Sequence, residues 1–401
     1  MTVKFVIGSV ATACAALVLS ACSTGATSST GTSTGTSTAT SAGTGTSAGT
    51  GIASSSASAS AAGSSVIDKQ LTATVGPNGE KPTPLDQLTL SDAEVAKLRA
   101  GNYTAAQLWH TSSQFVSAVQ SGANAEFARL GIKVQANANA NMNAGTQANQ
   151  VQTALVKKPS VMIGLPVDPT SAAAAFQPAV KAGTKLVFLS NVPKGYTYGK
   201  DYSSIVTDDL YDMGKRAAEA LGNSIGGKGD VAILFYDAQY YVTNQRDAAF
   251  KTTIEKEFPN IKIVAEKGFS DPSNATSIAG AVLTQHRNVA GIYASWAQPA
   301  EGVLSALRTV GNTSTKVVTL DLDDPIVVDM ATGGATVAVV ADKAWDVGRG
   351  MADAAAYALL GKKAPAFAVA GAITITKGNI ADGYQQSLHA EVPASVKKVL
   401  K

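Results

Sequence analysis

Strand-like and helix-like segments alternate along most of this chain, and residues 161–191 show the repeating unit most clearly. A short apolar run at 161–165 predicts a buried strand, and Asp168-Pro169 predict the start of a helix after it. Asp168 can accept hydrogen bonds from the free N–H groups of the first helical turn, and Pro169 suits a position that needs no donor. A second apolar run follows at 186–189. Strand, helix and strand form one right-handed βαβ unit, which requires a parallel sheet.

The same alternation continues along the chain to about residue 360. Further strands are predicted at 104–109, 132–136, 203–207, 231–235, 262–266, 291–294, 316–320 and 336–340, most of them followed by a helix. This order is typical of two doubly wound α/β lobes. Polar residues follow several of the strands directly. Because ligands bind at the carboxyl ends of parallel strands in such sheets, we expect a ligand site there.

The first 65 residues predict export and a tether. A positive start precedes an apolar run at 6–19 that is too short for a comfortable membrane span, and LSAC at its end resembles a bacterial lipobox. We therefore expect a signal peptide at 1–21, cleavage before Cys22 and a lipid on its thiol. The alternative is a plain secretory signal with a chance cysteine. Residues 22–65 are almost wholly Ser, Thr, Gly and Ala, which favours a disordered tether.

A lead-in segment at 66–103 separates this tether from the alternating pattern. Ser91 and Glu94 form a capping-box pattern, which predicts a short helix to about residue 99. The part before residue 89 contains prolines and predicts no particular element.

The composition argues against several kinds of chemistry. A net charge of +3 with scattered Lys and Arg does not provide the clustered basic surface that nucleic acid requires. The three histidines lack the spacing of a zinc site, and Cys14 and Cys22 both lie in the first 22 residues. The sequence GGKG at 226–229 lacks the spacing of a phosphate-binding loop, and no Gly-x-Ser-x-Gly nucleophile motif occurs. We expect no enzymatic activity, no cofactor and no metal.

Several short sequences, taken in order, resemble type I periplasmic binding proteins of the ribose-binding kind. They are PVDP at 166–169 with Ala182-Gly183, Asp208-Asp209 with Gly214, QRDAAF at 245–250, TLD at 319–321, and Gly333-Gly334 before a strand that ends at Asp342 with Gly348 beyond it. The resemblance extends over residues 104–377. It implies two doubly wound parallel-sheet lobes joined by a three-crossing hinge. Lobe 1 would comprise 104–207 plus 343–371, and lobe 2 would comprise 208–342 plus 372–401.

The resemblance also implies a ligand cleft between the lobes and assigns nine residues to it. These are Ser112, Phe115, Ser190, Asn191, Tyr241, Arg246, Trp296, Asp321 and Asp342. Ser190 and Asn191 stand where sugar binders of the family usually have Asp-Arg, so neutral hydrogen bonds replace charge-assisted ones. The guanidinium of Arg246 can donate two bonds to vicinal hydroxyls or to a carboxylate. Trp296 can stack on the apolar face of a sugar ring.

Neighbouring residues leave alternatives at this cleft. Tyr240 is the alternative to Tyr241, since adjacent residues on a strand cannot both face inward. Asp208 is expected to be a hinge-turn residue, and the lone His110 is expected to be structural. A cation site at Asp321, Asp323 and Asp324 is less favoured than a charged turn.

The combined pattern indicates an exported, lipid-anchored solute receptor of an ABC importer. We expect a monomer on the outer face of the cytoplasmic membrane, or in the periplasm of a two-membrane host. Its partners would be a small sugar or polyol and the membrane permease, with no nucleic acid. Alternatives are a nucleoside or quorum-sensing furanosyl ligand, a sensor subunit, or an exported enzyme. A repressor effector domain shares the fold, but it would require a helix-turn-helix where this chain has its lipobox.

Overall fold

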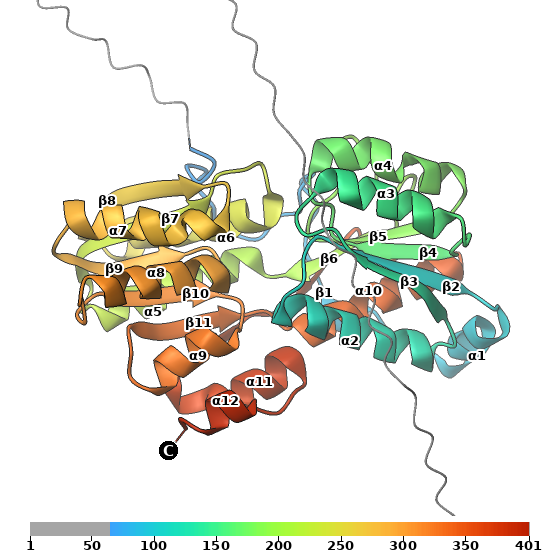
Figure 1. Cartoon of the computed structure of the whole chain (residues 1–401). Helices are drawn as coiled ribbons and strands as arrows, with labels where there is room; N and C mark the ends of the chain where they lie inside the picture. The colour runs from blue at the N-terminus through green and yellow to red at the C-terminus, as the bar shows by residue number, and fades with distance from the viewer. Residues whose placement is uncertain (1–64, 401) are drawn as a thin grey trace, which may run out of the picture. The chain divides into compact units, whose positions relative to one another are not determined.

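Two β-sheets form the cores of the computed structural model, which describes residues 65–400 (Figure 1). The first sheet has the strand order β1 (Thr83–Pro84), β12 (Phe367–Ala370), β6 (Ser204–Asp208), β5 (Lys185–Leu189), β4 (Val161–Gly164), β2 (Thr104–Trp109) and β3 (Lys133–Asn139). All its strand pairs are parallel. We call this sheet with its helices lobe 1. The predicted signal peptide, Cys22 and the tether up to residue 64 lie outside the described residues.

The second sheet, with its helices, is called lobe 2. Its strand order is β13 (Ile373–Ile375), β11 (Thr336–Ala341), β10 (Lys316–Leu320), β9 (Val289–Ala294), β7 (Lys228–Tyr236) and β8 (Asn260–Phe269). Only the pairing of β13 with β11 is antiparallel among these strands. The ten predicted strands are all present. The three short strands β1, β12 and β13 were not predicted, because segments of two to four residues are too short to show a period.

Helices cover both faces of the lobe 1 sheet. They are α1 (Asp92–Ala100), α2 (Gln114–Arg129) and α10 (Ala344–Leu359) on one face, and α3 (Ala144–Leu155) and α4 (Pro169–Lys181) on the other. The alternation along β2 shows why the sheet needs both layers. Trp109 belongs to the core beneath α2 and α10, whereas Leu108 belongs to the core beneath α3 and α4.

Lobe 2 repeats this arrangement. Its helices are α5 (Leu210–Ser224) and α6 (Tyr241–Glu257) on one face, and α7 (Ala275–Gln285), α8 (Ala297–Thr309) and α9 (Asp324–Ala331) on the other, with α11 (Ile380–Leu388) and α12 (Ala394–Lys397) beside α9. Ile233 of β7 faces α5 and α6, and Leu234 faces α7 and α8. The predicted architecture of two doubly wound α/β lobes is therefore confirmed.

The helix-start signals predicted from the sequence act as expected. The carboxylate of Asp168 accepts from the backbone N–H of Ser171 at 2.7 Å, and Pro169 is the first residue of α4. Ser91 and Glu94 form the predicted capping box before α1. These signals set the first residues of α4, which follows β4, and of α1, which lies within the lead-in segment.

The chain passes between the two sheets at three places. These are the ends of β6, β11 and β12, each of which is followed by an element of the other lobe. The first two passages are tied together, because the backbone N–H of Lys343 donates to Oδ1 of Asp208 at 2.9 Å. Both passages therefore form one hydrogen-bonded unit at the hinge.

Residues 65–90, which we call the strap, contact both lobes. Ile67 is buried in the lobe 2 core, and the ammonium of Lys251 lies 2.7 Å from Asp68. Further along, the hydroxyl of Tyr202 donates to Glu80 at 2.8 Å, and β1 then pairs with β12 of lobe 1. The strap is therefore part of the folded unit.

Candidate functional site

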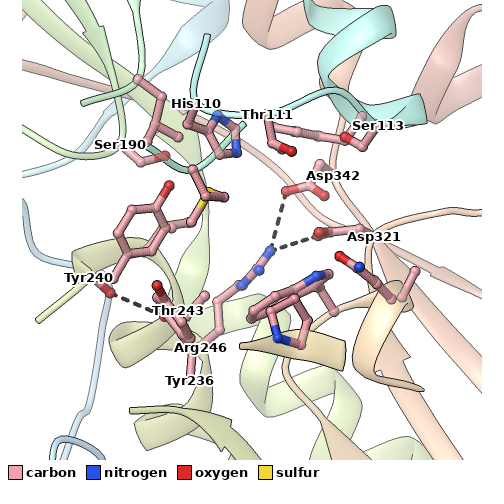
Figure 2. Close-up of a pocket in the computed structure, with 18 of the residues that line it drawn as sticks. His110, Thr111, Ser113, Ser190, Tyr236, Tyr240, Thr243, Arg246, Asp321 and Asp342 are labelled. Atoms are coloured by element: carbon pink, nitrogen blue, oxygen red, sulfur yellow. Dashed lines mark hydrogen bonds and ion pairs between the residues drawn. The ribbon is translucent and has the colours of Figure 1, made fainter. Parts of the chain in front are cut away.

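A cavity of about 180 Å³ lies where the strands of both sheets end (Figure 2). Its walls come from the segments that follow β2 to β6 in lobe 1 and β7 to β11 in lobe 2. The residues that line the cavity include His110, Ser112, Phe115, Met142, Leu165, Ser190, Asp208, Tyr236, Tyr240, Arg246, Trp296, Asp321, Asp323 and Asp342. The site therefore lies at the sheet edge where parallel α/β sheets bind ligands.

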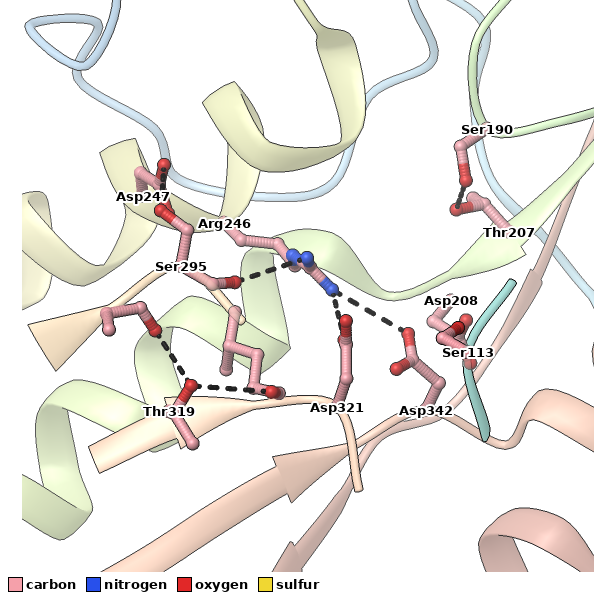
Figure 3. Close-up of polar contacts among 12 residues, drawn as sticks. Ser113, Ser190, Thr207, Asp208, Arg246, Asp247, Ser295, Thr319, Asp321 and Asp342 are labelled. Atoms are coloured by element: carbon pink, nitrogen blue, oxygen red, sulfur yellow. Dashed lines mark hydrogen bonds and ion pairs between the residues drawn. The ribbon is translucent and has the colours of Figure 1, made fainter. Parts of the chain in front are cut away.

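Arg246 is the central cation of this site (Figure 3). It lies in the second turn of α6 and is only 4% exposed. One of its terminal nitrogens donates to Asp321 at 2.7 Å and lies 3.9 Å from Asp342, and the other donates to the carbonyl of Ser295 at 3.3 Å. Burial lowers the pKa of Arg246, but the two carboxylates outweigh burial and raise that pKa above its ordinary value. The guanidinium stays charged, and Nε has no partner within residues 65–400.

Three cavity residues hold a left-handed backbone: Met142 in the loop after β3, with a φ of 57°, and one residue in each lobe directly after a strand. Ser190 follows β5 with a φ of 53°, and Asp321 follows β10 with a φ of 65°. Non-glycine residues rarely adopt this left-handed conformation, and they concentrate at functional sites. The hydroxyl of Ser190 lies 2.8 Å from that of Thr207, and the side chain of Asp321 remains 22% exposed. Both side chains are thus positioned by backbone geometry at corresponding strand ends.

Two buried carboxyl groups stand at the hinge passages. Burial raises the pKa of Asp208 to about 7, although Asp342 and the N–H of Lys343 partly offset this by hydrogen bonding. Burial and the negative charges of Asp321 and Asp208 raise the pKa of Asp342 well above its ordinary value. The pair therefore retains a proton that exposed aspartates would lose.

Aromatic rings from lobe 2 form the wall beside Arg246. The ring of Tyr236 meets Trp296 edge-to-face at a centroid distance of 5.6 Å, and meets Tyr240 in the same way at 5.7 Å. Phe269 supports Trp296 from behind at 5.2 Å. The hydroxyl of Tyr240 is buried and has no hydrogen-bond partner among the described residues. This wall offers apolar ring faces and one free hydroxyl.

Lobe 1 contributes neutral groups. Ser112, Phe115 and Met142 line the cavity together with Ser190 and His110. Burial lowers the pKa of His110 to about 4, while the charge of Asp321 acts in the opposite direction. The imidazole is therefore neutral near pH 7.

Comparison with known families identifies this architecture. The sequence matches the periplasmic binding protein domain over residues 107–363, which is more than half of the chain. The chain belongs to the periplasmic binding protein family. The predicted resemblance to the type I branch is confirmed, and the fold of this branch places the ligand between two lobes.

Solved structures extend this assignment. An ABC transporter solute-binding protein from Agrobacterium vitis, bound to α-D-tagatopyranose, is 24% identical with a TM-score of 0.66, and the match covers 72% of this chain and 100% of that one. One from Mycobacterium smegmatis, with bound glycerol, is 26% identical with a TM-score of 0.64 over 73% and 100%. A carbohydrate-binding relative from Agrobacterium radiobacter, with D-arabinose, is 23% identical with a TM-score of 0.64 over 72% and 99%. No curated protein sequence matches this chain.

Two predicted site residues of this periplasmic binding protein do not line the cavity. Asn191 is fully buried, where it donates to the carbonyl of Pro166 at 3.3 Å and accepts from the N–H of Val242 at 3.2 Å. It therefore connects lobe 1 to α6. Tyr241 points away and donates to the carbonyl of Val75 in the strap. The other seven predicted residues line the cavity.

The choice between the two tyrosines was wrong because both were expected on a strand. Instead, α6 begins at Tyr241, and Tyr240 is its N-cap. On a helix the cavity-facing positions continue at Thr243 and Arg246, three residues apart, so Tyr241 must face elsewhere. Asn244, whose side chain accepts from the N–H of Tyr240 at 2.9 Å, was the missed signal for this start.

Other cavity residues were also missed. His110 and Asp208 line the cavity, although the sequence analysis assigned them structural roles. Tyr236 is the last residue of β7 and Met142 lies in the loop after β3, and the strand-end rule could have found Tyr236. Among residues 65–400, no cluster of His, Cys, Asp and Glu has the arrangement of a metal site, and no helix is long and apolar enough to cross a membrane.

Proposed function

We propose that this protein is an extracytoplasmic solute receptor for an ABC importer and that it captures a small sugar or polyol between its lobes. The observation that supports this most is the cavity itself, whose lining comes from strand ends of both sheets. Three of the similar solved structures hold α-D-tagatopyranose, D-arabinose or glycerol, all polyhydroxylated molecules.

The cavity groups suit such a ligand. Arg246 and Asp321 can make charge-assisted hydrogen bonds to vicinal hydroxyls, which are roughly twice as strong as neutral ones. Ser112 and Ser190 supply weaker neutral partners. The apolar face of a sugar ring can pack against Trp296 and Tyr236. The charged pair would therefore orient the ligand, and the two rings would provide most of the apolar contact area.

Capture would proceed by closure about the hinge passages. A ligand shifts the lobes toward the closed state only as far as it binds that state better than the open one. Groups on both lobes provide this difference, because a ligand in an open cleft can touch only one wall. The closed surface would then dock on the permease, and the lipid on Cys22 with the tether would hold the receptor at the membrane.

A thermal-shift screen of the full-length chain in mild detergent tests ligand binding. Sugars, polyols, nucleosides and amino acids are compared at high concentration, since a ligand at a hundred times its Kd adds about 2.7 kcal/mol of stability. We expect a rise with sugars or polyols that Asp321→Asn removes and that the exposed Asp237→Asn retains. A rise limited to nucleosides or amino acids would overturn the ligand class.

Metabolic labelling with a radioactive fatty acid tests the anchor separately. We expect label in the wild-type chain and none in Cys22→Ala. Equal labelling of the two chains would exclude lipidation at Cys22 and leave the binding result unaffected.

A further inference from the structure

The cavity carries an excess of acidic groups. Of the described residues that line it, four are aspartates and one is an arginine. The four aspartates, which we call the acidic cluster, are Asp208, Asp321, Asp323 and Asp342. The remaining basic side chain is His110, which is neutral because burial lowers its pKa to about 4. With every carboxyl ionised, this wall would carry three more negative than positive charges.

Arg246 cannot neutralise this cluster alone. Its closest bonds go to Asp321 and to the carbonyl of Ser295, and Asp342 lies at 3.9 Å. Asp208 is bonded to a backbone N–H, which carries no net charge. Asp208 and Asp342 are both nearly inaccessible to water. An ionised buried carboxylate without a cation is costly, so these groups either keep protons or require another positive charge.

The aromatic wall provides a second, independent feature that suits a cation. The ring of Tyr236 stands edge-to-face to both Tyr240 and Trp296, and all three rings line the cavity together with the acidic cluster. Such ring faces attract ammonium groups, and they do so more strongly when the cation is desolvated. Tyr240 is 5% exposed, and its buried hydroxyl, which lacks a partner within the described part of the chain, can accept a hydrogen bond from an N–H donor.

We propose that the ligand is a hydroxylated molecule that carries a protonated amine, namely an amino sugar or an amino polyol. This inference rests on the proposed receptor function and specifies its ligand class. The amine lies between the acidic cluster and the aromatic wall, and the hydroxyls bond to Arg246 and to the serines of lobe 1. A neutral sugar fills the same space but leaves the buried carboxyls without a cation.

Proton release on binding is a consequence of this arrangement. The groups that face Asp208 and Asp342 are Arg246 from α6, Asp321 after β10, His110 after β2 and the N–H of Lys343 before α10. Since burial raises the pKa of both aspartates, the empty site holds at least one proton near neutral pH. An incoming ammonium replaces that proton, whereas a neutral ligand does not.

Isothermal calorimetry of the full-length chain in detergent, with matched ligand pairs, tests the proposal. The pairs are sorbitol with N-methylglucamine, glucose with glucosamine, and galactose with galactosamine. The measurements are made at about pH 6.5, below the pKa of an ordinary aliphatic amine. We expect the amine of at least one pair to bind ten times more tightly or better than its neutral partner. Buffers that differ in ionisation enthalpy then report proton release for the amine alone.

Variants locate the effect. Asp342→Asn removes one buried carboxyl and should lower amine affinity tenfold or more, by a larger factor than it lowers the affinity of the neutral partner. Asp323→Asn is the second variant, because this half-buried side chain lines the cavity and its change poses little risk to folding. The control is Asp237→Asn, an exposed residue outside the cavity lining that should leave both affinities unchanged.

The outcomes separate the two proposals. Equal or tighter binding of the neutral partners overturns the amine proposal and leaves the receptor function standing. The same conclusion follows if the amine preference survives in both cavity variants. If no member of any pair binds, the sugar or polyol receptor function fails together with this inference.

Discussion

The two lobes meet at one cavity but contribute different chemistry to it. Lobe 2 supplies Arg246, Asp321 and Asp323, together with the aromatic wall around Trp296. Lobe 1 supplies hydroxyls, a neutral imidazole and apolar side chains. Between them, at the hinge passages, lie the carboxyls of Asp208 and Asp342. The strong directional interactions are therefore concentrated on one wall.

This asymmetry suggests an order of events. For a ligand that carries a protonated amine, charged groups dominate the first encounter because their attraction extends furthest, so lobe 2 is expected to hold that ligand in the open state. The neutral groups of lobe 1 act only over contact distance, and they stabilise the closed state. Substitutions in lobe 2 should therefore change association and dissociation, whereas those in lobe 1 should mainly change dissociation.

The largest effect is expected from Arg246→Ala. This change leaves Asp321 and Asp342 without their cation, and breaking a buried ion pair costs roughly 3–5 kcal/mol of unfolding free energy. Ligand binding should be lost as well. Chemical denaturation and calorimetry measure both. The control Arg216→Ala removes a surface pair with Asp212 and should cost at most about 1 kcal/mol; equal losses for the two variants would contradict a central role for Arg246.

The next effect is a pH dependence at the hinge. Folding raises the pKa of Asp208 to about 7 from an unfolded value of about 4, so the folded state binds the additional proton between these values. The contribution of Asp208 to stability is therefore complete at low pH and is lost as pH rises toward 7. Asp208→Asn keeps an acceptor for the N–H of Lys343 without this proton.

Denaturation of both chains from pH 4 to pH 8 measures this difference. The unfolding free energy of Asp208→Asn, relative to wild type, should increase as pH rises through this range and level off above about pH 7. A constant difference at every pH would show that Asp208 titrates as an exposed carboxyl.

A smaller effect is expected from aromatic truncation, and it compares the lobes directly. Trp296→Ala should cost roughly 1.5–3 kcal/mol of binding free energy. The substitution removes the large ring that is proposed to contact the ligand and that packs against Tyr236. Phe115→Ala on lobe 1 should cost less, because this half-buried ring also packs against its own lobe. Calorimetry ranks the two, and a larger loss for Phe115→Ala would reverse the assignment of the dominant wall.

The smallest effect is expected from Ser190→Ala. One neutral hydrogen bond is worth about 0.5–1.5 kcal/mol, and alanine accepts the positive φ no better and no worse than serine. Stopped-flow fluorescence should show faster ligand dissociation with an unchanged association rate. The control Ser121→Ala lies on the exposed side of α2 and should change neither rate. A slower association in Ser190→Ala would contradict the proposed order of events.

Much of this fold was accessible from the sequence because its signals are local. Apolar runs marked ten strands, and Asp168 with Pro169 marked a helix start by hydrogen-bonding rules that act within four residues. The resemblance to the family assigned Arg246 and Asp321 to the cleft, and both line the cavity. Their mutual pairing was not predicted, since it joins residues 75 positions apart.

The rest depended on information that a local pattern does not contain. Whether Tyr240 and Tyr241 belong to a strand or to the start of α6 decides which of them faces the cavity, because each helical step turns a side chain by about 100°. Asn191 is polar and follows a strand, as a ligand contact would, yet its bonds to Pro166 and Val242 make it a structural residue. Only the assembled lobes distinguish these two roles.

The pairing of β1 with β12 covers one edge of the lobe 1 sheet. Without the strap, β12 would expose a row of free backbone donors and acceptors, which is a template for pairing with another chain. The strap covers that row with only two residues, and the second is Pro84, which has no N–H to offer a further strand. A recombinant protein that begins after Pro84 would lose this cover and should self-associate, so the boundary for expression lies before Ser65.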